Sequence, residues 1–356
     1  MGETMRGLTG KLLLSLFAVL FTAGLLEGAF RLLDLRGVHR NRSRDWNHAL
    51  LSPKERLPGV WMQFRPNTSF RLDYDSNPRG YFDRDNGLSY RINRHGFRGP
   101  DFERRKAAGT FRIAVLGDSF TFGEGVKWED TFVKRLERLL AAGAGSEIEI
   151  LNLGVSGWTS KSEVRFLEQA GLDFEPDLVL VVYVLNDTKY LPRLEVWEGF
   201  RTAYEPEGIL RHSYFASWIY ARVARHVQGQ RYVEALVEGA LQQRGRWEKM
   251  LSELLAGKRI AAEAGAGYAV VIFPFMYRLD ESYPFAVIHR MVEAALREGG
   301  IPVLDLFPAF EGESYTRLWV HPSDQHPNDR AHEIAARAMG EFLETERLVE
   351  PGQRGF

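Results

Sequence analysis

Five short runs of apolar residues, separated by segments with helical periodicity, constrain the fold of this 356-residue chain more than any other feature. A continuous apolar run is typical of a strand that is buried on both faces, as the strands of parallel sheets are. The runs occupy residues 113–116, 148–151, 178–184, 269–273 and 302–306, and helical periods occupy residues 131–140, 161–170, 213–264 and 284–297. This alternation predicts βαβ units and a five-stranded parallel sheet covered by helices on both faces, a three-layer α/β/α arrangement.

The remaining segments suggest how the chain is divided. Residues 1–33 contain a hydrophobic stretch, and residues 34–108 are rich in proline and turn pairs with short alternating runs, which predicts a small, loop-rich β segment. Residues 109–346 form the expected main domain. Within it, residues 188–266 are too long for a simple crossover, so we expect a helical insertion there.

The hydrophobic stretch at residues 12–26 predicts an N-terminal membrane helix, which would make this chain a single-pass membrane protein. A span needs about 20 apolar residues, so the helix must extend toward residue 33 and accommodate Glu27 and Arg31. A cleaved signal peptide and a buried amphipathic helix are the alternatives, although no small-x-small cleavage site follows the run. Arg6 and Lys11 favour a cytoplasmic N-terminus with the main domain outside the cytoplasm, whereas several arginines after residue 30 oppose it.

Charge and cysteine content exclude several classes of function. The chain has 46 basic and 47 acidic side chains, for a net charge of −1, so binding to nucleic acid through phosphate neutralisation is not expected. It has no cysteine, which removes disulfides, thiolate metal ligands and thiol nucleophiles.

Polar residues follow the apolar runs at the positions where strands of a parallel sheet would end. Gly117-Asp118-Ser119-Phe120 follows the first run, a segment that contains Gly157 follows the second, and Asn186-Asp187 follows the third. Near the C-terminus, Asp324-x-His326-Pro327-Asn328 stands immediately before a helical period. In an open parallel sheet, ligands bind outside the carboxyl ends of the strands, so these residues form the candidate site.

These four segments, in this order, resemble the conserved blocks of the SGNH (GDSL-type) hydrolases over residues 112–343. The resemblance implies a flavodoxin-like three-layer fold and a serine esterase. In one respect the chain departs from the family, which usually places its acid three residues before the histidine, where this chain has Ser323. Asp324, two residues before, matches the spacing of the membrane-associated polysaccharide O-acetylation members and is the expected acid, with Asp305 in reserve.

Acyl transfer chemistry assigns a role to each of these residues. Ser119 would be the nucleophile and His326 the base that removes its proton, while Asp324 would orient the imidazole and stabilise its charged form. The backbone N–H groups of Ser119 and Gly157 and the side-chain amide of Asn186 would form the oxyanion hole. This mechanism needs no metal and no organic cofactor.

Structural roles compete with each assignment. Ser119 could only cap a helix, Asn186-Asp187 could be a turn pair, and Asn328 is expected to cap the last helix. His321 and His332 flank the last block and are interpreted as structural. The zincin pattern fails because Ala336 stands where its second histidine belongs, and no dinucleotide or phosphate-binding glycine pattern is complete.

The expected function is therefore a membrane-anchored serine esterase that acts on an O-acyl ester, with an acetyl group on an envelope carbohydrate as the candidate substrate. An O-acetyltransferase with the same triad, a non-catalytic carbohydrate-binding or assembly protein of the same fold, and a soluble thioesterase or lipase are the alternatives. Sequence does not separate hydrolysis from transfer, because both proceed through the same acyl-enzyme.

Overall fold

The structure is a computed structural model that describes residues 2–33, 35, 41–43, 46–142, 147–188 and 208–349. The chain divides into two compact units, Met1–Arg40 with Leu191–Leu236 and Asn41–Tyr190 with Val237–Phe356. Parts of the predicted linker (34, 36–40 and 44–45) and of the predicted insertion (189–207) lie outside the described residues.

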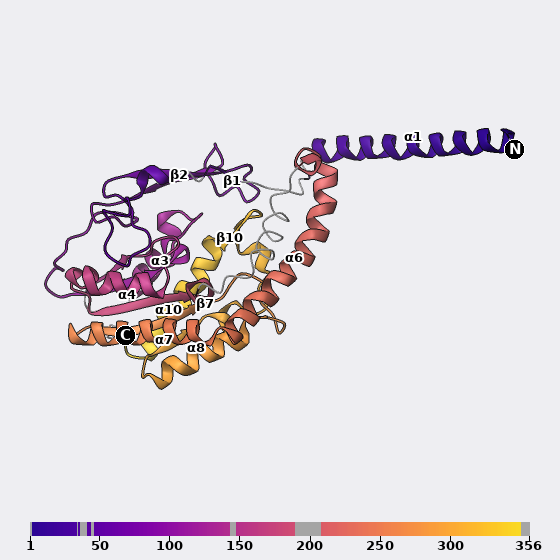
Figure 1. Ribbon diagram of the computed structural model, residues 1–356. Coiled ribbons are helices and arrows are strands. Elements are labelled where there is room, and N and C mark those ends of the chain that lie inside the picture. Colours follow the sequence, from indigo (N-terminus) through magenta and orange to yellow (C-terminus); the bar gives the residue numbers. More distant parts are fainter. Residues whose placement is uncertain are drawn as a thin grey trace. The chain divides into compact units, whose positions relative to one another are not determined.

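The larger unit is built on a five-stranded parallel sheet, which confirms the predicted fold class (Figure 1). All five apolar runs are strands, and all seven residues of the central strand are buried. The strand order, 2-1-3-4-5 in chain order, is that of flavodoxin-like folds. From one edge to the other the strands are β5 (Glu147–Asn152), β4 (Thr110–Gly117), β6 (Leu178–Val184), β7 (Gly267–Phe273) and β8 (Val303–Asp305).

Helices cover both faces of this sheet. Helices α3 (Phe132–Ala141) and α10 (Asp329–Thr345) pack against each other on one face. On the other face α7 (Arg244–Glu263) packs against both α4 (Ser160–Gln169) and α8 (Ala286–Glu298). Parallel strands are joined by right-handed crossovers. Because the chain reverses its direction across the sheet after β5, the helices that connect strands before and after this reversal lie on opposite faces of the sheet. The result is the predicted three-layer arrangement.

The predicted β-rich segment is also present, in the larger unit. It contains an antiparallel sheet of β1 (Asn41–Ser43), β2 (Ser69–Tyr74) and β3 (Gly87–Arg91). The rings of Phe70 and Tyr90 from this sheet stack with Phe122, two residues after the first polar block, at centroid distances of 6.1 and 5.4 Å. Burial of these rings fixes the β-rich segment against the part of the main domain that carries the candidate nucleophile.

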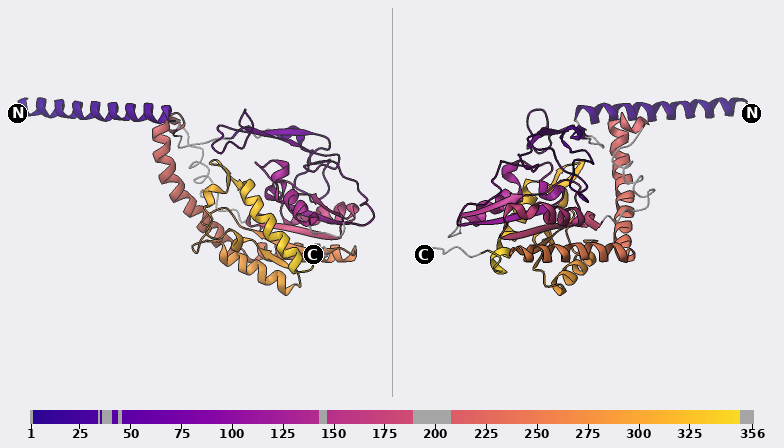
Figure 2. Two further views of the ribbon diagram at one scale, coloured as in Figure 1. Left: turned by 180° about the vertical axis from the view of Figure 1, so that it is seen from behind. Right: turned by 60° about the vertical axis from the view of Figure 1, so that its left-hand side comes forward.

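In the smaller unit, the hydrophobic stretch forms a single helix, α1 (Gly2–Leu32), seen as one uninterrupted coil in Figure 2. Within it, Gly10–Leu32 is long and apolar enough to cross a membrane, although a signal sequence has the same properties. Glu27 accepts hydrogen bonds from Ser213 Oγ (2.7 Å) and from the backbone N–H groups of Tyr214 and Phe215 (both 3.0 Å). It therefore caps the start of α6 (Tyr214–Gln242), and Arg31 forms an ion pair with it at 2.7 Å. The two charges that interrupt the apolar pattern are thus neutralised by each other and by a helix N-terminus.

Candidate active site

Ser119 is placed by the turn that follows the first strand of the sheet. β4 ends at Gly117, and the short helix α2 (Ser119–Phe122) begins two residues later. Asp118 caps this helix, because its Oδ1 accepts a hydrogen bond of 2.9 Å from the backbone N–H of Phe120. Capping is thus the role of Asp118, and the hydroxyl of Ser119 is directed to another partner.

That partner is His326. A hairpin of β9 (Trp319–His321) and β10 (Asp324–Pro327) carries the last polar block. His326 Nε2 lies 2.9 Å from Ser119 Oγ, and His326 Nδ1 lies 2.5 Å from Asp324 Oδ1. Both distances are within hydrogen-bonding range, as proton transfer from the hydroxyl to the imidazole requires.

The carboxylate that contacts this imidazole is that of Asp324, the expected acid, whereas the reserve residue Asp305 contacts a different histidine. Asp324 is 2% exposed, and its second oxygen, Oδ2, accepts a hydrogen bond of 2.9 Å from the hydroxyl of Tyr74 in β2. Asp305 instead lies 2.8 Å from His289 Nδ1. Asn328 caps α10, as predicted, by accepting hydrogen bonds from two backbone N–H groups of its first turn. This cap fixes the loop that carries the histidine.

The second and third polar blocks adjoin the nucleophile turn. The side-chain amide of Asn186 donates a hydrogen bond of 2.8 Å to Asp118 Oδ2. In the second block, Asn152 Nδ2 donates to the carbonyl of Thr121 at 2.8 Å, and a Cβ at Gly154 would fall 2.6 Å from the backbone nitrogen of Phe122. The loop after β5 therefore lies in direct contact with α2. Gly157, in that loop, has a φ of +79°, a conformation that glycine adopts without strain.

A comparison with protein families agrees with this geometry. Residues 115–334, more than half of the chain and all four blocks, match the model of the GDSL-like lipase/acylhydrolase family. This chain belongs to that family.

Solved structures with a similar fold include TesA and two proteins described as esterases. TesA is 16% identical, with a TM-score of 0.41 over 66% of this chain and 98% of TesA. A two-domain esterase active on acetylated mannans is 18% identical, with a TM-score of 0.41 over 70% of this chain and 53% of that chain. A catalytic mutant of the acetylxylan esterase Axe2 from Geobacillus stearothermophilus is 18% identical, with a TM-score of 0.39 over 66% and 94% of the two chains. No curated protein matches this chain in sequence.

In this GDSL-like acylhydrolase the two other histidines near the last block are buried and have structural partners. His321 contacts Ser323 Oγ at 2.7 Å and Ser76 Oγ at 3.0 Å, and so ties the hairpin to the β-rich segment. His332 Nδ1 accepts a hydrogen bond of 2.9 Å from the backbone N–H of Phe132, and burial lowers its pKa to about 3. A histidine that stays neutral in this way suits helix packing between α10 and α3.

Burial affects two acidic groups, Asp118 in the nucleophile turn and Glu163 in α4. Burial raises the pKa of Asp118, an effect that the hydrogen bond from Asn186 opposes. Burial, and the nearby Asp118 charge, also raise the pKa of Glu163 in α4 well above its usual range. Because Glu163 is fully buried, we interpret it as a protonated, neutral side chain.

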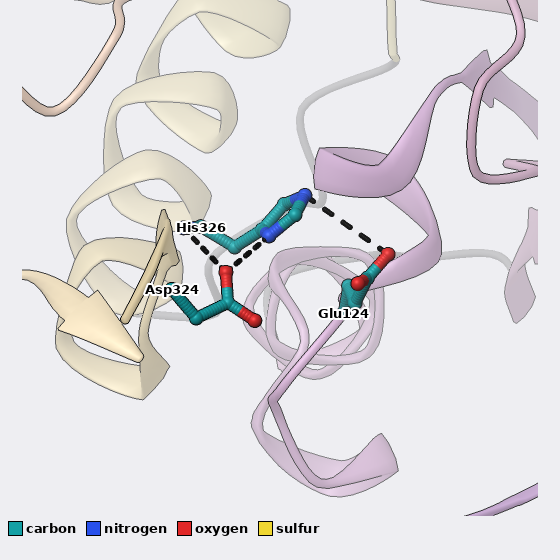
Figure 3. A group of neighbouring side chains, drawn as sticks. All are labelled: Glu124, Asp324 and His326. Carbon is teal, nitrogen blue, oxygen red and sulfur yellow. Dashed lines mark hydrogen bonds and ion pairs between the residues drawn. The ribbon is translucent and has the colours of Figure 1, made fainter. Parts of the chain in front are cut away.

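Sequence reasoning missed three residues at this site: Tyr74, Glu124 and Ser156. Glu124 Oε2 lies 4.0 Å from His326 Nε2, on the opposite edge of the imidazole from Asp324 (Figure 3), and accepts a hydrogen bond of 3.1 Å from Ser156 Oγ. The only sequence signal for Glu124 was its position between two glycines. Tyr74 had no signal, because it lies in a segment that the sequence presents as a linker.

Among the described residues, Glu124, Asp324 and His326 are also close enough to hold a metal ion, with ligand atoms within 4.8 Å of one another. The imidazole nitrogens, however, are already within hydrogen-bonding distance of Ser119 Oγ and Asp324 Oδ1. A cation bound to Nε2 would have to displace the contact with Ser119 Oγ, and one bound to Nδ1 the contact with Asp324 Oδ1. The arrangement therefore fits a hydrogen-bonded relay better than a metal centre.

Proposed function

We propose that this protein is a serine esterase in which Ser119, His326 and Asp324 act as nucleophile, base and orienting acid. The observation that carries the proposal is the chain of contacts from Ser119 Oγ to His326 Nε2 (2.9 Å) and from His326 Nδ1 to Asp324 Oδ1 (2.5 Å). A serine hydroxyl becomes an effective nucleophile only when a base accepts its proton, and the imidazole is in position to do so.

In the proposed reaction, Ser119 Oγ attacks the ester carbonyl while its proton moves to His326 Nε2. The tetrahedral oxyanion would be bound by the backbone N–H groups of Ser119 and Gly157 and by the amide of Asn186. The proton then passes to the leaving alcohol as the carbon–oxygen bond breaks, which leaves an acyl-enzyme. Water, deprotonated by the same imidazole, releases the acid.

The substrate that we propose is an O-acetyl ester on a carbohydrate of the cell envelope. The spacing of the last block, shared with membrane-associated polysaccharide O-acetylation proteins, supports this substrate, as does a helix apolar enough to anchor the protein. The same acyl-enzyme could pass its acetyl group to a sugar hydroxyl instead of water. Adding a sugar acceptor separates the two outcomes, because only a transferase would form an acetylated sugar.

The nucleophile is tested with the full chain in detergent micelles, p-nitrophenyl acetate and a fluorophosphonate probe. We expect hydrolysis and covalent labelling in the wild type and neither in Ser119→Ala. Ser252→Ala is the matched control, because this exposed serine of α7 only donates to the carbonyl of Lys249. Labelling of Ser119→Ala by the probe, or full activity of this variant, would refute the triad. A wild type that neither reacts with the probe nor hydrolyses p-nitrophenyl acetate would favour a binding protein.

Membrane anchoring is tested separately. We propose that α1 holds the protein in the membrane with the catalytic unit outside the cytoplasm. We expect the protein to remain in the membrane fraction after carbonate extraction and to be digested by protease added to the outer face of that membrane. Release by carbonate would contradict the anchor, and protection from protease would contradict the orientation.

A further inference from the structure

Glu124 lies in a turn whose shape is fixed by its two neighbours. Gly123 and Gly125 both have a φ of +79°, in the left-handed region. A Cβ at Gly123 would fall 2.7 Å from the side chain of Thr131, and a Cβ at Gly125 would fall 2.3 Å from that of Val320. Both positions therefore require glycine, for conformation and for space. The turn has little freedom to present Glu124 in any other direction.

The turn places a carboxyl side chain in the interior beside the imidazole. Glu124 is 3% exposed, and its Oε2 accepts the hydrogen bond from Ser156 Oγ at 3.1 Å while lying 4.0 Å from His326 Nε2. Asp324 lies at the other nitrogen, at 2.5 Å. The imidazole thus has a carboxylate near each of its nitrogens (Figure 3). A buried carboxylate is costly unless something compensates its charge, and the His326 imidazole, which can become positive, lies 4.0 Å from Glu124.

We propose that Glu124 is a positioning residue of the active site, a second carboxylate that stabilises the imidazolium of His326 from its Nε2 side. The inference rests on the proposed serine esterase function. When Ser119 Oγ forms its bond to the acyl carbon, its proton moves to Nε2 and the ring becomes positive. When the alcohol leaves, it takes this proton and the ring becomes neutral again. Glu124 exchanges no proton with the ring or with the substrate in these steps.

This role has a consequence for the pH dependence of activity. Among the described residues, the charged or titratable groups that act on His326 include Asp324 from β10, Glu124 after α2, Asp118 at the start of α2 and His332 from α10. An opposite charge at about 4–6 Å favours the charged form of a group, so Glu124 raises the pKa of the His326 imidazole. Below that pKa the ring is protonated and cannot accept the proton of Ser119. Glu124 therefore stabilises the imidazolium, and as a consequence it moves the acidic limb of the pH profile of activity to higher pH.

The test is the pH profile of kcat/KM for p-nitrophenyl acetate, measured on the full chain in detergent micelles. Glu124→Gln preserves the shape of the side chain and removes its charge. We expect its acidic limb to lie about one to three pH units lower than in the wild type, and its maximal kcat/KM to fall about tenfold or more. Glu129→Gln, the same change at an exposed glutamate five residues later, is the matched control and should overlay the wild type. An acidic limb of Glu124→Gln at the wild-type position would overturn the proposal.

Two further measurements keep the inference separable from folding and from the proposed function. Glu124→Asp retains the carboxylate but shortens the side chain by one methylene. The acidic limb of its pH profile should therefore also move to lower pH, by a smaller amount than in Glu124→Gln. The pKa of His326, followed by NMR of ¹⁵N-histidine-labelled protein, should fall in Glu124→Gln whether or not a substrate is turned over. An unchanged His326 pKa in Glu124→Gln would refute the role of Glu124. If that pKa falls as expected but the protein shows no Ser119-dependent turnover, only the esterase function is refuted.

Discussion

The side-chain amide of Asn186 donates a hydrogen bond of 2.8 Å to Oδ2 of Asp118, and so joins the loops that follow β6 and β4. These two strands are neighbours in the sheet, at the point where the order of the strands reverses. Ligands bind at such a point in open parallel sheets, because the loops on its two sides diverge. The hydrogen bond therefore positions a proposed oxyanion donor relative to the adjacent nucleophile, Ser119.

This relationship predicts that Asn186 and Asp118 act on catalysis as a pair. Asn186→Ala should lower kcat about 10²–10³-fold, as expected for the loss of one oxyanion donor. Asp118→Asn should lower it about tenfold, because this change can keep the oxygen that caps α2 but removes the acceptor that orients the Asn186 amide. The double variant should be little worse than Asn186→Ala alone, since both changes disrupt the same arrangement. The measurement is kcat of all four forms with p-nitrophenyl acetate, and effects that multiply would contradict the coupling.

The sequence predicted the sheet and the four site blocks because both depend on local patterns. Each strand that is buried on both faces needs a continuous apolar run, and residues 178–184 are such a run and form β6 without a change of bounds. Ser119 and Asn186 follow from where two strands of the sheet end, and the last block follows from where the last helix begins. Parallel topology then brings these ends together without any further information from the sequence.

The contacts that refine the site could not be predicted, because they join segments with no local signature. Tyr74 reaches Asp324 across 250 positions of the chain, and its own surroundings indicate only a short strand. Glu27 is a charge in an apolar helix, and nothing in that helix indicates that its carboxylate caps α6. Such pairings are set by tertiary packing, which hydrophobic periodicity does not encode.

Tyr74→Phe tests whether the β-rich segment supports the acid of the triad. The change removes only the hydroxyl that donates to Asp324 Oδ2 at 2.9 Å. A hydrogen bond to a charged group contributes about 1.5–3 kcal/mol, so unfolding should require less denaturant, and kcat should fall several-fold as the carboxylate loses its orientation. Tyr283→Phe is the matched control, because this buried hydroxyl accepts a hydrogen bond from the backbone N–H of Phe275 and contacts His289 Nε2. Tyr283→Phe should lower stability without changing kcat. An equal effect of Tyr74→Phe and Tyr283→Phe on kcat would argue against a specific support of Asp324 by Tyr74.

Glu27→Ala tests the cap at the start of α6. Without the carboxylate, the backbone N–H groups of Tyr214 and Phe215 lose their acceptor, and loss of a cap costs about 1 kcal/mol. Hydrogen exchange at these two amides should therefore accelerate about fivefold in the full chain in detergent micelles. Glu341→Gln, at an exposed position of α10, should leave the exchange rates at both amides unchanged. Equal protection of the two amides in Glu27→Ala would show that the cap does not stabilise the helix.

His332 should make the stability of the protein fall as the solution becomes acidic. Burial lowers its pKa from 6.5 to about 3 in the folded state, where its Nδ1 accepts the hydrogen bond from Phe132. Between these two values the unfolded state binds a proton that the folded state does not, so each unit of decreasing pH removes up to about 1.4 kcal/mol of stability. Above pH 6.5 the contribution is constant, because His332 is neutral in both states.

The measurement is the free energy of unfolding by denaturant at several pH values between 7 and 4. His332→Gln removes the titrating group and should show a shallower decline than the wild type, while His48→Gln, at an exposed histidine, should follow the wild type. The difference between the wild-type and His332→Gln slopes isolates this residue from the other groups that titrate in the same range. Identical slopes would mean that His332 becomes protonated without unfolding, and that its hydrogen bond to Phe132 does not hold the ring neutral.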